Sequence, residues 1–362
     1  MALPIIDPAQ YATQLGAKLA HFKDQFAEFG IPEPGVFESE PLHYRMRVEF
    51  RMWHHDGRVD YAMFDPADPK RVVLIEAFPA AAQRIAAAMG ALRDYLQGND
   101  VLRHRIFQVE FLATLSGELL VALVYHRPLD ERWEREARSL AQALDVLVIG
   151  RSRKQKIVLD RDWLLERFEL DGRELRYKQI EGSFTQPNAG VNRKMLGWAR
   201  EQAAGIGGDM LELYCGNGNF TVALAPLFGK VLATEVSKSS VHAAHYNLDA
   251  NGVRNVAMVR MASEEISDAL AGGREYRRMR EIELADYRFS TLFVDPPRSG
   301  LDVATLELAA RFDNILYISC NPVTMQQNVA ALAETHRVAA SAVFDQFPYT
   351  EHLEAGLVLQ RR

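Results

Sequence analysis

Residues 211–220 read Leu-Glu-Leu-Tyr-Cys-Gly-Asn-Gly-Asn-Phe, and this segment is the clearest indication of the fold class. An apolar run enters a turn that contains Gly216 and Gly218, and a helical pattern follows at 220–228. Glycines at such a turn let the backbone bend sharply and let a ligand approach the main chain closely. A strand, a glycine turn and a helix in this order are typical of the ligand-binding turn of a doubly wound α/β sheet.

Strand-like and helix-like segments alternate on both sides of this turn. We expect strands at 209–214, 230–234, 257–260, 291–294 and 314–319, and helices at 192–202, 220–228, 239–251 and 303–310. This alternation predicts an α/β fold with a Rossmann-like, doubly wound parallel sheet in the C-terminal half.

The N-terminal half has a different pattern. Apolar and mostly charged side chains alternate over 44–52, and a turn at 54–57 leads to a second strand at 58–64, which together indicate a hairpin. We expect a second hairpin at 105–126, helices at 8–29, 80–96 and 129–144, and a strand at 146–150. This half therefore reads as an α+β domain of residues 1–180, followed by a second domain of residues 181–362. The boundary falls in the charged, hairpin-like segment 160–184.

The composition is that of a globular protein. The chain has 362 residues, enough for two domains, with 48% hydrophobic residues and a net charge of −6. No apolar run approaches the roughly 20 residues that span a bilayer, and no secretory signal is readable. Its two cysteines, Cys215 and Cys320, cannot form a disulfide framework or a four-cysteine iron–sulfur cluster. We expect a cytoplasmic protein that would contact nucleic acid through local patches rather than overall charge.

The glycine turn and the strand after it indicate a nucleoside ligand. Glu235 ends that strand about 20 residues further on, where an acidic side chain can accept both hydroxyls of a ribose. The turn lacks the third glycine that packs a helix under a pyrophosphate. This favours S-adenosylmethionine over NAD, which remains the second alternative.

Two further strand ends carry reactive groups. Asp295 is followed by two prolines, which cannot continue a central strand, so its side chain should lie at the carboxyl edge where ligands bind. Methyltransferases that act on amino groups follow such an Asp-Pro-Pro with an aromatic residue. Arg298 stands there instead, which disfavours methylation of an exocyclic nitrogen.

Cys320 ends the next strand in the same way, before Pro322. A thiolate that adds to carbon 6 of a pyrimidine makes carbon 5 nucleophilic, and a base must later remove the carbon 5 proton. We interpret Cys320 as this nucleophile and Cys215, inside the glycine turn, as a packing residue. Candidate bases, which the local sequence does not rank, are Glu351, His352 and Glu354.

Together these segments resemble the RNA uracil-5-methyltransferase family, and most closely its transfer-RNA branch. The residues that carry the resemblance are 43–50, 183–188, 211–220, 295–301, 319–322 and 344–356. The resemblance implies that Cys320 is the nucleophile and Glu354 the proton-abstracting base. It also implies S-adenosylmethionine as cofactor, with contacts at Gln186, Tyr214, Asn219, Glu235 and Asp295.

The same resemblance suggests the substrate. Ribosomal branches usually carry an iron–sulfur cluster, and some add a small β-barrel, and this sequence has neither. That points to uridine 54 of the transfer-RNA T loop, with the tRNA-like part of transfer-messenger RNA as a further substrate. Residues 1–180 would then bind RNA, and the resemblance favours Arg51, Phe107 and His126 for this. We expect no metal site, since His54 and His55 lie in a polar turn without suitable ligand spacing.

Three alternatives remain open from the sequence. One is an RNA-binding module without catalysis, in which Cys320 and Glu354 would be unnecessary. Another is a NAD-dependent oxidoreductase, which should have the missing third glycine. The third keeps the enzyme but takes ribosomal RNA as substrate.

Overall fold

In the computed structural model, which describes residues 6–65 and 68–362, the chain forms two compact units. The first is made mainly of Glu40–Arg167 and Gln179–Ala189, and the second of Ala9–Ser39, Phe168–Lys178 and Gly190–Arg362. The predicted division at residue 180 assigns the N-terminal helix to the first half, whereas here that helix belongs to the second unit. The reason is packing, because its Phe22 and Phe26 are buried in a core cluster of the second unit.

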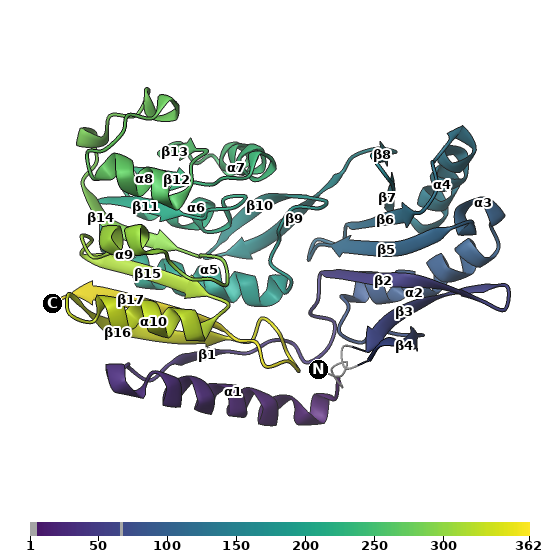
Figure 1. The fold of residues 1–362 in the computed structure, drawn as a ribbon, viewed down its shortest axis with the longest axis horizontal. Helices are drawn as coiled ribbons and strands as arrows, with labels where there is room; N and C mark the ends of the chain where they lie inside the picture. Colours follow the sequence, from purple (N-terminus) through teal and green to yellow (C-terminus); the bar gives the residue numbers. More distant parts are fainter. Residues whose placement is uncertain (1–5, 66–67) are drawn as a thin grey trace. The chain divides into compact units, whose positions relative to one another are not determined.

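The first unit is a seven-stranded sheet with the order β4-β3-β2-β5-β6-β7-β8 (Figure 1). Its strands are β2 (Arg47–His55), β3 (Arg58–Asp65), β4 (Asp68–Ile75), β5 (Ile106–Ala113), β6 (Leu119–Tyr125), β7 (Leu147–Ser152) and β8 (Gln155–Val158). Its helices are α2 (Gln83–Gln97), α3 (Asp100–Arg103) and α4 (Glu131–Leu144). Both predicted hairpins are present, since β2 pairs with β3 and β5 pairs with β6 in antiparallel register.

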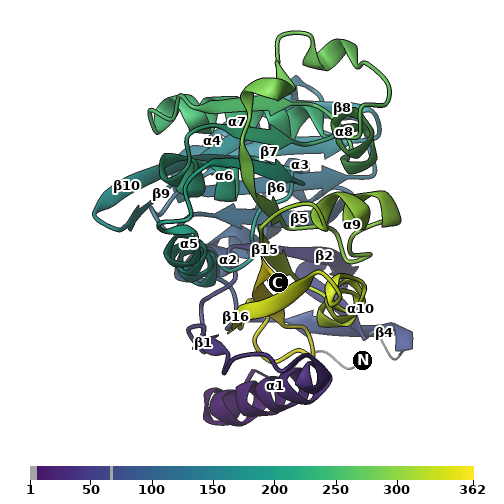
Figure 2. The same cartoon turned by 90° about the vertical axis from the view of Figure 1, so that its left-hand side faces the viewer.

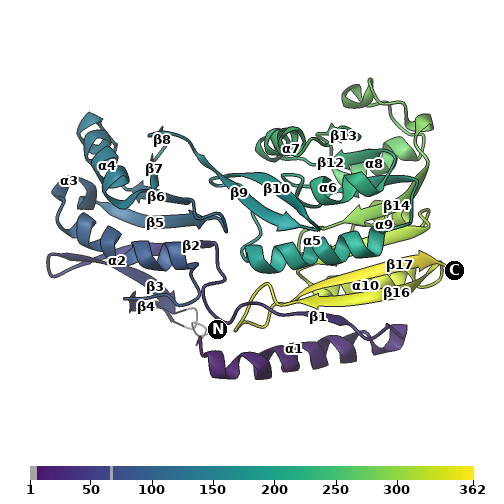
Figure 3. The same cartoon turned by 180° about the vertical axis from the view of Figure 1, so that it is seen from behind.

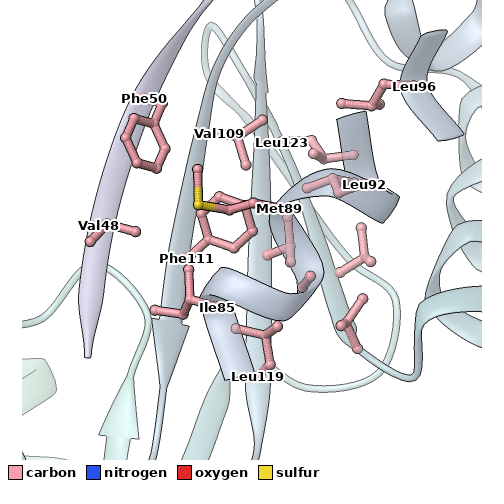
Figure 4. Packing of buried hydrophobic residues seen from close by; sticks show 14 of the residues in the cluster. Val48, Phe50, Ile85, Met89, Leu92, Leu96, Val109, Phe111, Leu119 and Leu123 are labelled. Carbon is pink, nitrogen blue, oxygen red and sulfur yellow. The ribbon is translucent and has the colours of Figure 1, made fainter. Parts of the chain in front are cut away.

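Helices pack against one face of this sheet, and a smaller apolar cluster that includes Leu112 and Leu120 lies on the other. Phe50 of β2 and Phe111 of β5 pack with Ile85 and Met89 of α2 (Figure 4). Side chains alternate between the faces of a strand, so Arg51 lies on the opposite face from Phe50. The charged side chains of the predicted alternation therefore lie on the face of the sheet that the helices do not cover.

The second unit is an eight-stranded sheet with the order β1-β16-β17-β15-β14-β11-β12-β13. Its strands are β1 (Gly35–Phe37), β11 (Asp209–Leu213), β12 (Val231–Thr234), β13 (Val256–Val259), β14 (Phe289–Val294), β15 (Asn314–Ser319), β16 (His336–Phe344) and β17 (Glu354–Arg361). The central strands are parallel, whereas β17 runs antiparallel between β15 and β16.

Helices cover both faces of this sheet, which confirms the doubly wound α/β prediction. They are α1 (Tyr11–Gln25), α5 (Ala189–Ala203), α6 (Asn219–Leu224), α7 (Lys238–Ala250), α8 (Ser263–Leu270), α9 (Val303–Ala309) and α10 (Pro322–Leu332). Leu316 and Ile318 of β15 face the core formed with α5, which Figure 3 shows in front of the strands, whereas Ile315 and Tyr317 face the core formed with α1 and α10 (Figure 2).

The segment predicted as a hairpin between the halves is one. It consists of β9 (Trp163–Leu170) and β10 (Arg173–Ile180), which form a two-stranded sheet. Within residues 6–65 and 68–362, no helix is long and apolar enough to cross a membrane.

Candidate active site

Residues with reactive side chains lie together at the carboxyl edge of the second unit's sheet. β11, β14 and β15 are parallel neighbours, so the glycine turn, Asp295 and Cys320 follow strands that end at the same edge. β17 runs the other way and begins at Glu354, whose neighbour Ala355 pairs with Ser319. The antiparallel register therefore places Glu354 beside Cys320, although 33 positions separate them in the chain.

Hydrogen bonds fix the turn that carries Cys320. Asn321 caps α10 by accepting a bond from the backbone N–H of Val323, at 3.2 Å, and Pro322 occupies the first turn, where it needs no N–H partner. The Asn321 side-chain amide also donates to the carbonyl of Arg298, at 2.8 Å. This bond ties the turn after β15 to the turn after β14 and so holds Arg298 near the thiol.

The charges around Cys320 oppose one another. Burial, followed by the negative charges of Glu354 and Asp295, raises the pKa of the Cys320 thiol to about 11. The charge of Arg298 and a hydrogen bond from its side chain act in the opposite direction. Arg298 is thus the group in this cluster that favours a thiolate.

Both carboxyl groups of the cluster hold protons more firmly than usual. Burial raises the pKa of Asp295 to about 7. The pKa of Glu354 is raised well above its ordinary value by burial and by Asp295, and Arg298 opposes this. A thiol and two carboxyls with raised pKa values therefore lie together with one guanidinium, a clustering typical of functional sites.

The three candidate bases lie in different environments. Glu354 is only 3% exposed, whereas Glu351 is exposed and His352 is half-buried. The pKa of His352 is lowered by burial and by the charges of Arg298 and Lys18. Burial beside Cys320 singles out Glu354 among them.

The glycine turn borders a cavity suited to a nucleoside. Gly218 caps α6 with a positive φ of 79°, a conformation that favours glycine. Glu235 accepts hydrogen bonds from the backbone N–H groups of Gly216, at 3.0 Å, and Ser237, at 2.7 Å. A cavity of about 380 Å³ beside it is lined by residues that include Tyr214, Glu235 and Met261. An acidic side chain and apolar surface suit a ribose and an adenine.

The other expected cofactor residues have different surroundings. Asn219 begins α6, and its side chain exchanges two hydrogen bonds with Asn192 of α5, at 2.8 and 2.9 Å. Tyr214 donates to the hydroxyl of Ser263, at 2.8 Å. Gln186 belongs to the first unit, and its contact with a cofactor stays a prediction.

Sequence reasoning missed two features of this region. Glu212 of β11 is 1% exposed, and burial raises its pKa to about 8. An acidic residue within an apolar strand was the available signal. From the sequence, Arg298 was used only as an argument against nitrogen methylation. Its hydrogen bond to Cys320 could not be predicted, because it depends on the folded turn.

In the first unit, the three expected RNA-binding residues form one stack. The guanidinium carbon of Arg51 lies 3.7 Å from the ring centroid of Phe107, and the rings of Phe107 and His126 stack at 3.9 Å. One terminal nitrogen of Arg51 is buried without a hydrogen-bond partner in the described part of the chain. Two other basic side chains of this unit, Arg151 of β7 and Lys156 of β8, are less available because both pair with Glu181.

No group of three or more His, Cys, Asp or Glu side chains that could hold a metal occurs among the described residues.

The fold and this edge define a class of protein. A doubly wound sheet with a glycine turn after β11, an acidic residue closing β12 and an Asp-Pro-Pro end on β14 characterises a Rossmann-like methyltransferase. The structure is similar to that of Pyrococcus abyssi tRNA (uracil-54, C5)-methyltransferase in complex with S-adenosyl-L-homocysteine. The TM-score is 0.74, with 19% identity over 96% of this chain and 83% of that one. At this identity the likeness concerns the fold alone.

Sequence comparison then gives the family. A family model described as tRNA (Uracil-5-)-methyltransferase matches residues 10–362. A relative from Azoarcus sp. (strain BH72), named tRNA/tmRNA (uracil-C(5))-methyltransferase, is 72% identical over 100% of this chain and 99% of its own length. A relative of the same name from Pseudomonas entomophila (strain L48) is 53% identical over 99% of both chains. The chain belongs to the tRNA (uracil-5-)-methyltransferase family, which confirms the resemblance drawn from the motifs.

Proposed function

We propose that this protein methylates carbon 5 of uridine 54 in the T loop of transfer RNA, and of the equivalent uridine in the tRNA-like part of transfer-messenger RNA. The observation that carries the proposal is the pairing of Cys320 and Glu354, which adjacent strands β15 and β17 bring to one edge of the sheet. Position 54 rests on the motif resemblance, and transfer-messenger RNA also on the names of the relatives.

In the proposed reaction, the Cys320 thiolate adds to carbon 6 of the uracil, and the electron pair of the carbon 5–carbon 6 double bond becomes available at carbon 5. S-adenosylmethionine, the cofactor of this family, supplies a methyl group on a sulfonium when bound. Glu354 then takes the proton from carbon 5, the double bond re-forms and the carbon 6–sulfur bond breaks. With the methyl group on carbon 5, the products are 5-methyluridine, the demethylated cofactor as a thioether, a regenerated Cys320 thiolate and a protonated Glu354.

The charges of the cluster fit these duties. Arg298 favours the thiolate that begins the reaction and the thiolate that leaves at its end. A carboxyl whose pKa is raised by burial is a better proton acceptor than an ordinary one once it is ionised. The buried setting of Glu354 therefore supports its assignment as the base.

The cofactor would be held by the residues that the resemblance implies. Glu235 suits the ribose hydroxyls, and Tyr214 lines the same cavity. Asn219 and Asp295 follow the parallel neighbours β11 and β14 at the same sheet edge. Gln186 completes the set expected from the resemblance.

We assign RNA binding to residues 1–180, with Arg51, Phe107 and His126 as a platform for an unstacked nucleotide. A guanidinium and two stacked rings offer a phosphate contact and a surface for a base. We also infer a cytoplasmic location, where transfer RNA is found and thiols stay reduced.

The test is a trapping experiment with transfer RNA that contains 5-fluorouracil. Fluorine at carbon 5 leaves no proton for Glu354 to remove, so the adduct should persist through denaturing electrophoresis. We expect a shifted protein band with the wild type, with Cys215→Ser and with Glu354→Gln, and none with Cys320→Ala. A band that survives in Cys320→Ala would refute the role of this thiol.

Substrate choice needs a separate experiment. Methyl transfer should occur to unmodified transfer RNA and to the tRNA-like fragment of transfer-messenger RNA. It should disappear when uridine 54 is replaced by cytidine, and ribosomal RNA fragments should not be methylated. Methylation of the cytidine 54 variant at another uridine would move the target away from position 54.

A further inference from the structure

Glu354 is the first residue of β17, so the loop before it determines where its carboxylate points. This loop, residues 345–353, connects β16 to β17 and returns the chain across the pair Phe344–Glu354. It contains a strained point, because Tyr349 has a φ of +61°, which L-residues rarely adopt. Such a conformation persists only where surrounding structure holds it.

The surrounding structure is the N-terminal helix α1. Lys18 of α1 forms a buried ion pair with Asp345, the first loop residue, at 2.7 Å, and the Asp345 side chain is 0% exposed. The same ammonium donates to the carbonyl of Phe347, at 2.9 Å. Lys18 thus anchors the loop through two contacts.

Gln14, one helical turn before Lys18, adds two contacts on the same face of α1. Its amide donates to Asp345, at 3.0 Å, and its carbonyl accepts from the backbone N–H of the strained Tyr349, at 3.3 Å. One turn earlier, the ring of Tyr11 meets the ring of Tyr349 edge-on, with centroids 6.1 Å apart. Three successive turns of α1 therefore face the loop.

Charge links this anchor to the catalytic edge. The positive charge of Lys18 lowers the pKa of His352, two residues before Glu354. Burial also lowers the pKa of Lys18 itself, and the charge of Asp345 opposes this. A buried ion pair often adds no stability over apolar residues of similar volume, so stability alone does not explain Lys18 and Asp345 at this position.

We propose that Lys18 is a positioning residue for Glu354, and that α1 holds the 345–353 loop so that this carboxylate can reach the carbon 5 proton. The inference rests on the proposed function, in which Glu354 acts only after the methyl group has been transferred. Loss of the anchor should therefore slow proton removal and thiol release while leaving the earlier addition of Cys320 intact.

The experiment compares two steps in the full-length protein. Formation of the trapped complex with 5-fluorouracil transfer RNA reports addition and methyl transfer, which do not need Glu354. Turnover of ordinary transfer RNA also needs proton removal. In Lys18→Met we expect trapping within about twofold of wild type, and turnover about ten- to a hundredfold slower because a small misplacement of a reacting group costs this much. A denaturant-stable complex with ordinary transfer RNA should accumulate.

Two controls separate positioning from folding. Lys23→Met, also on α1, alters an exposed ion pair with Glu33, which lies beyond the helix, and should behave as wild type. Lys18→Met/Asp345→Leu removes both buried charges together, which is often neutral for stability, and should still turn over slowly.

Three outcomes decide the inference. Normal turnover in Lys18→Met, or in the double variant, would overturn it. Trapping and turnover that fall in parallel would also overturn it, because that pattern reports a general loss of structure. If wild type itself forms no trapped complex, the proposed function fails instead.

Discussion

At the scale of single residues, the reactivity of Cys320 depends on the charges of three neighbouring side chains, Glu354, Asp295 and Arg298. Cys320 is buried between two carboxyls that disfavour its thiolate and one guanidinium that favours it. The thiol is therefore protonated in the free enzyme at neutral pH, and its ionisation belongs to the reaction rather than to the resting state.

Arg298→Met should make Cys320 less reactive. It removes the cation and the hydrogen bond that lower the thiol pKa, so the alkylation profile should move to higher pH. At pH 8 the rate of alkylation by iodoacetamide should fall roughly three- to tenfold, since one pKa unit changes the thiolate fraction tenfold. Asp295→Asn, which removes a negative charge, should shift the profile to lower pH. Equal profiles in the two variants would exclude the electrostatic explanation. Cys215→Ser serves as the background, to remove the second thiol.

Asp295→Asn should also stabilise the free protein at pH 8. Burial raises the folded-state pKa of Asp295 to about 7, whereas an unfolded aspartate ionises near about 4. Between these values the folded state binds more protons than the unfolded state, so this group makes stability fall as pH rises from about 4 to about 7. The amide does not ionise, and urea unfolding should show a gain of roughly 1–4 kcal/mol at pH 8 and little at pH 4. An equal gain at both pH values would point to packing instead.

At the scale of secondary-structure elements, the sequence predicted those strands that are marked by residues next to them in the chain. Apolar runs ending in glycine or proline located β11, β14 and β15, and parallel strands bring such ends to one edge. That is why Asp295 and Cys320 could be placed together in advance.

The features that the sequence did not predict belong to elements that pack against segments far away in the chain. The antiparallel insertion of β17 between β15 and β16 cannot be read from a local pattern, and the ranking of Glu354 above Glu351 and His352 follows from that register. Helix α1 was expected at 8–29 within the first half, whereas the structure groups it with the second unit, because an amphipathic pattern does not reveal which sheet a helix covers.

Gly356 of β17 offers a test of the packing that holds Glu354. A Cβ there would lie 2.7 Å from the Trp198 ring of α5 and 3.1 Å from Ile318. Gly356→Ala should therefore destabilise the protein by about 1–3 kcal/mol, as overpacking of a core does. The matched control is Gly16→Ala on the exposed side of α1, where a Cβ meets nothing within 4 Å and helix propensity predicts a gain of about 0.5–1 kcal/mol. Thermal unfolding distinguishes the two, and an unaffected Gly356→Ala would show that β17 and α5 are less tightly packed than described.

At the scale of the whole molecule, a chain with a net charge of −6 is proposed to bind a polyanion. Attraction must then come from local groups, and the stack of Arg51, Phe107 and His126 is one such group in the first unit.

Arg51→Met should raise the KM for transfer RNA about tenfold at constant salt and leave the KM for S-adenosylmethionine unchanged. Stacking of one base on such a platform is worth roughly 1–3 kcal/mol, and Arg51 packs on the Phe107 ring that would offer it. The slope of log affinity for RNA against log salt concentration should also become shallower by about one, because one fewer counterion is released on binding. Arg254→Met, which alters an exposed ion pair with Asp249 in the second unit, is the control. A change in the cofactor KM would instead place Arg51 outside a purely RNA-binding role.

The central claim is that Cys320 and Glu354 act in sequence on one pyrimidine ring. Release of tritium from transfer RNA labelled at carbon 5 of uridine tests it most directly, together with methyl incorporation. Wild type should release one tritium for each methyl group transferred, Cys320→Ala should do neither, and Glu354→Gln should transfer the methyl group but retain the tritium in a complex bound to the protein. Tritium release by Cys320→Ala, or full release by Glu354→Gln, would contradict the account.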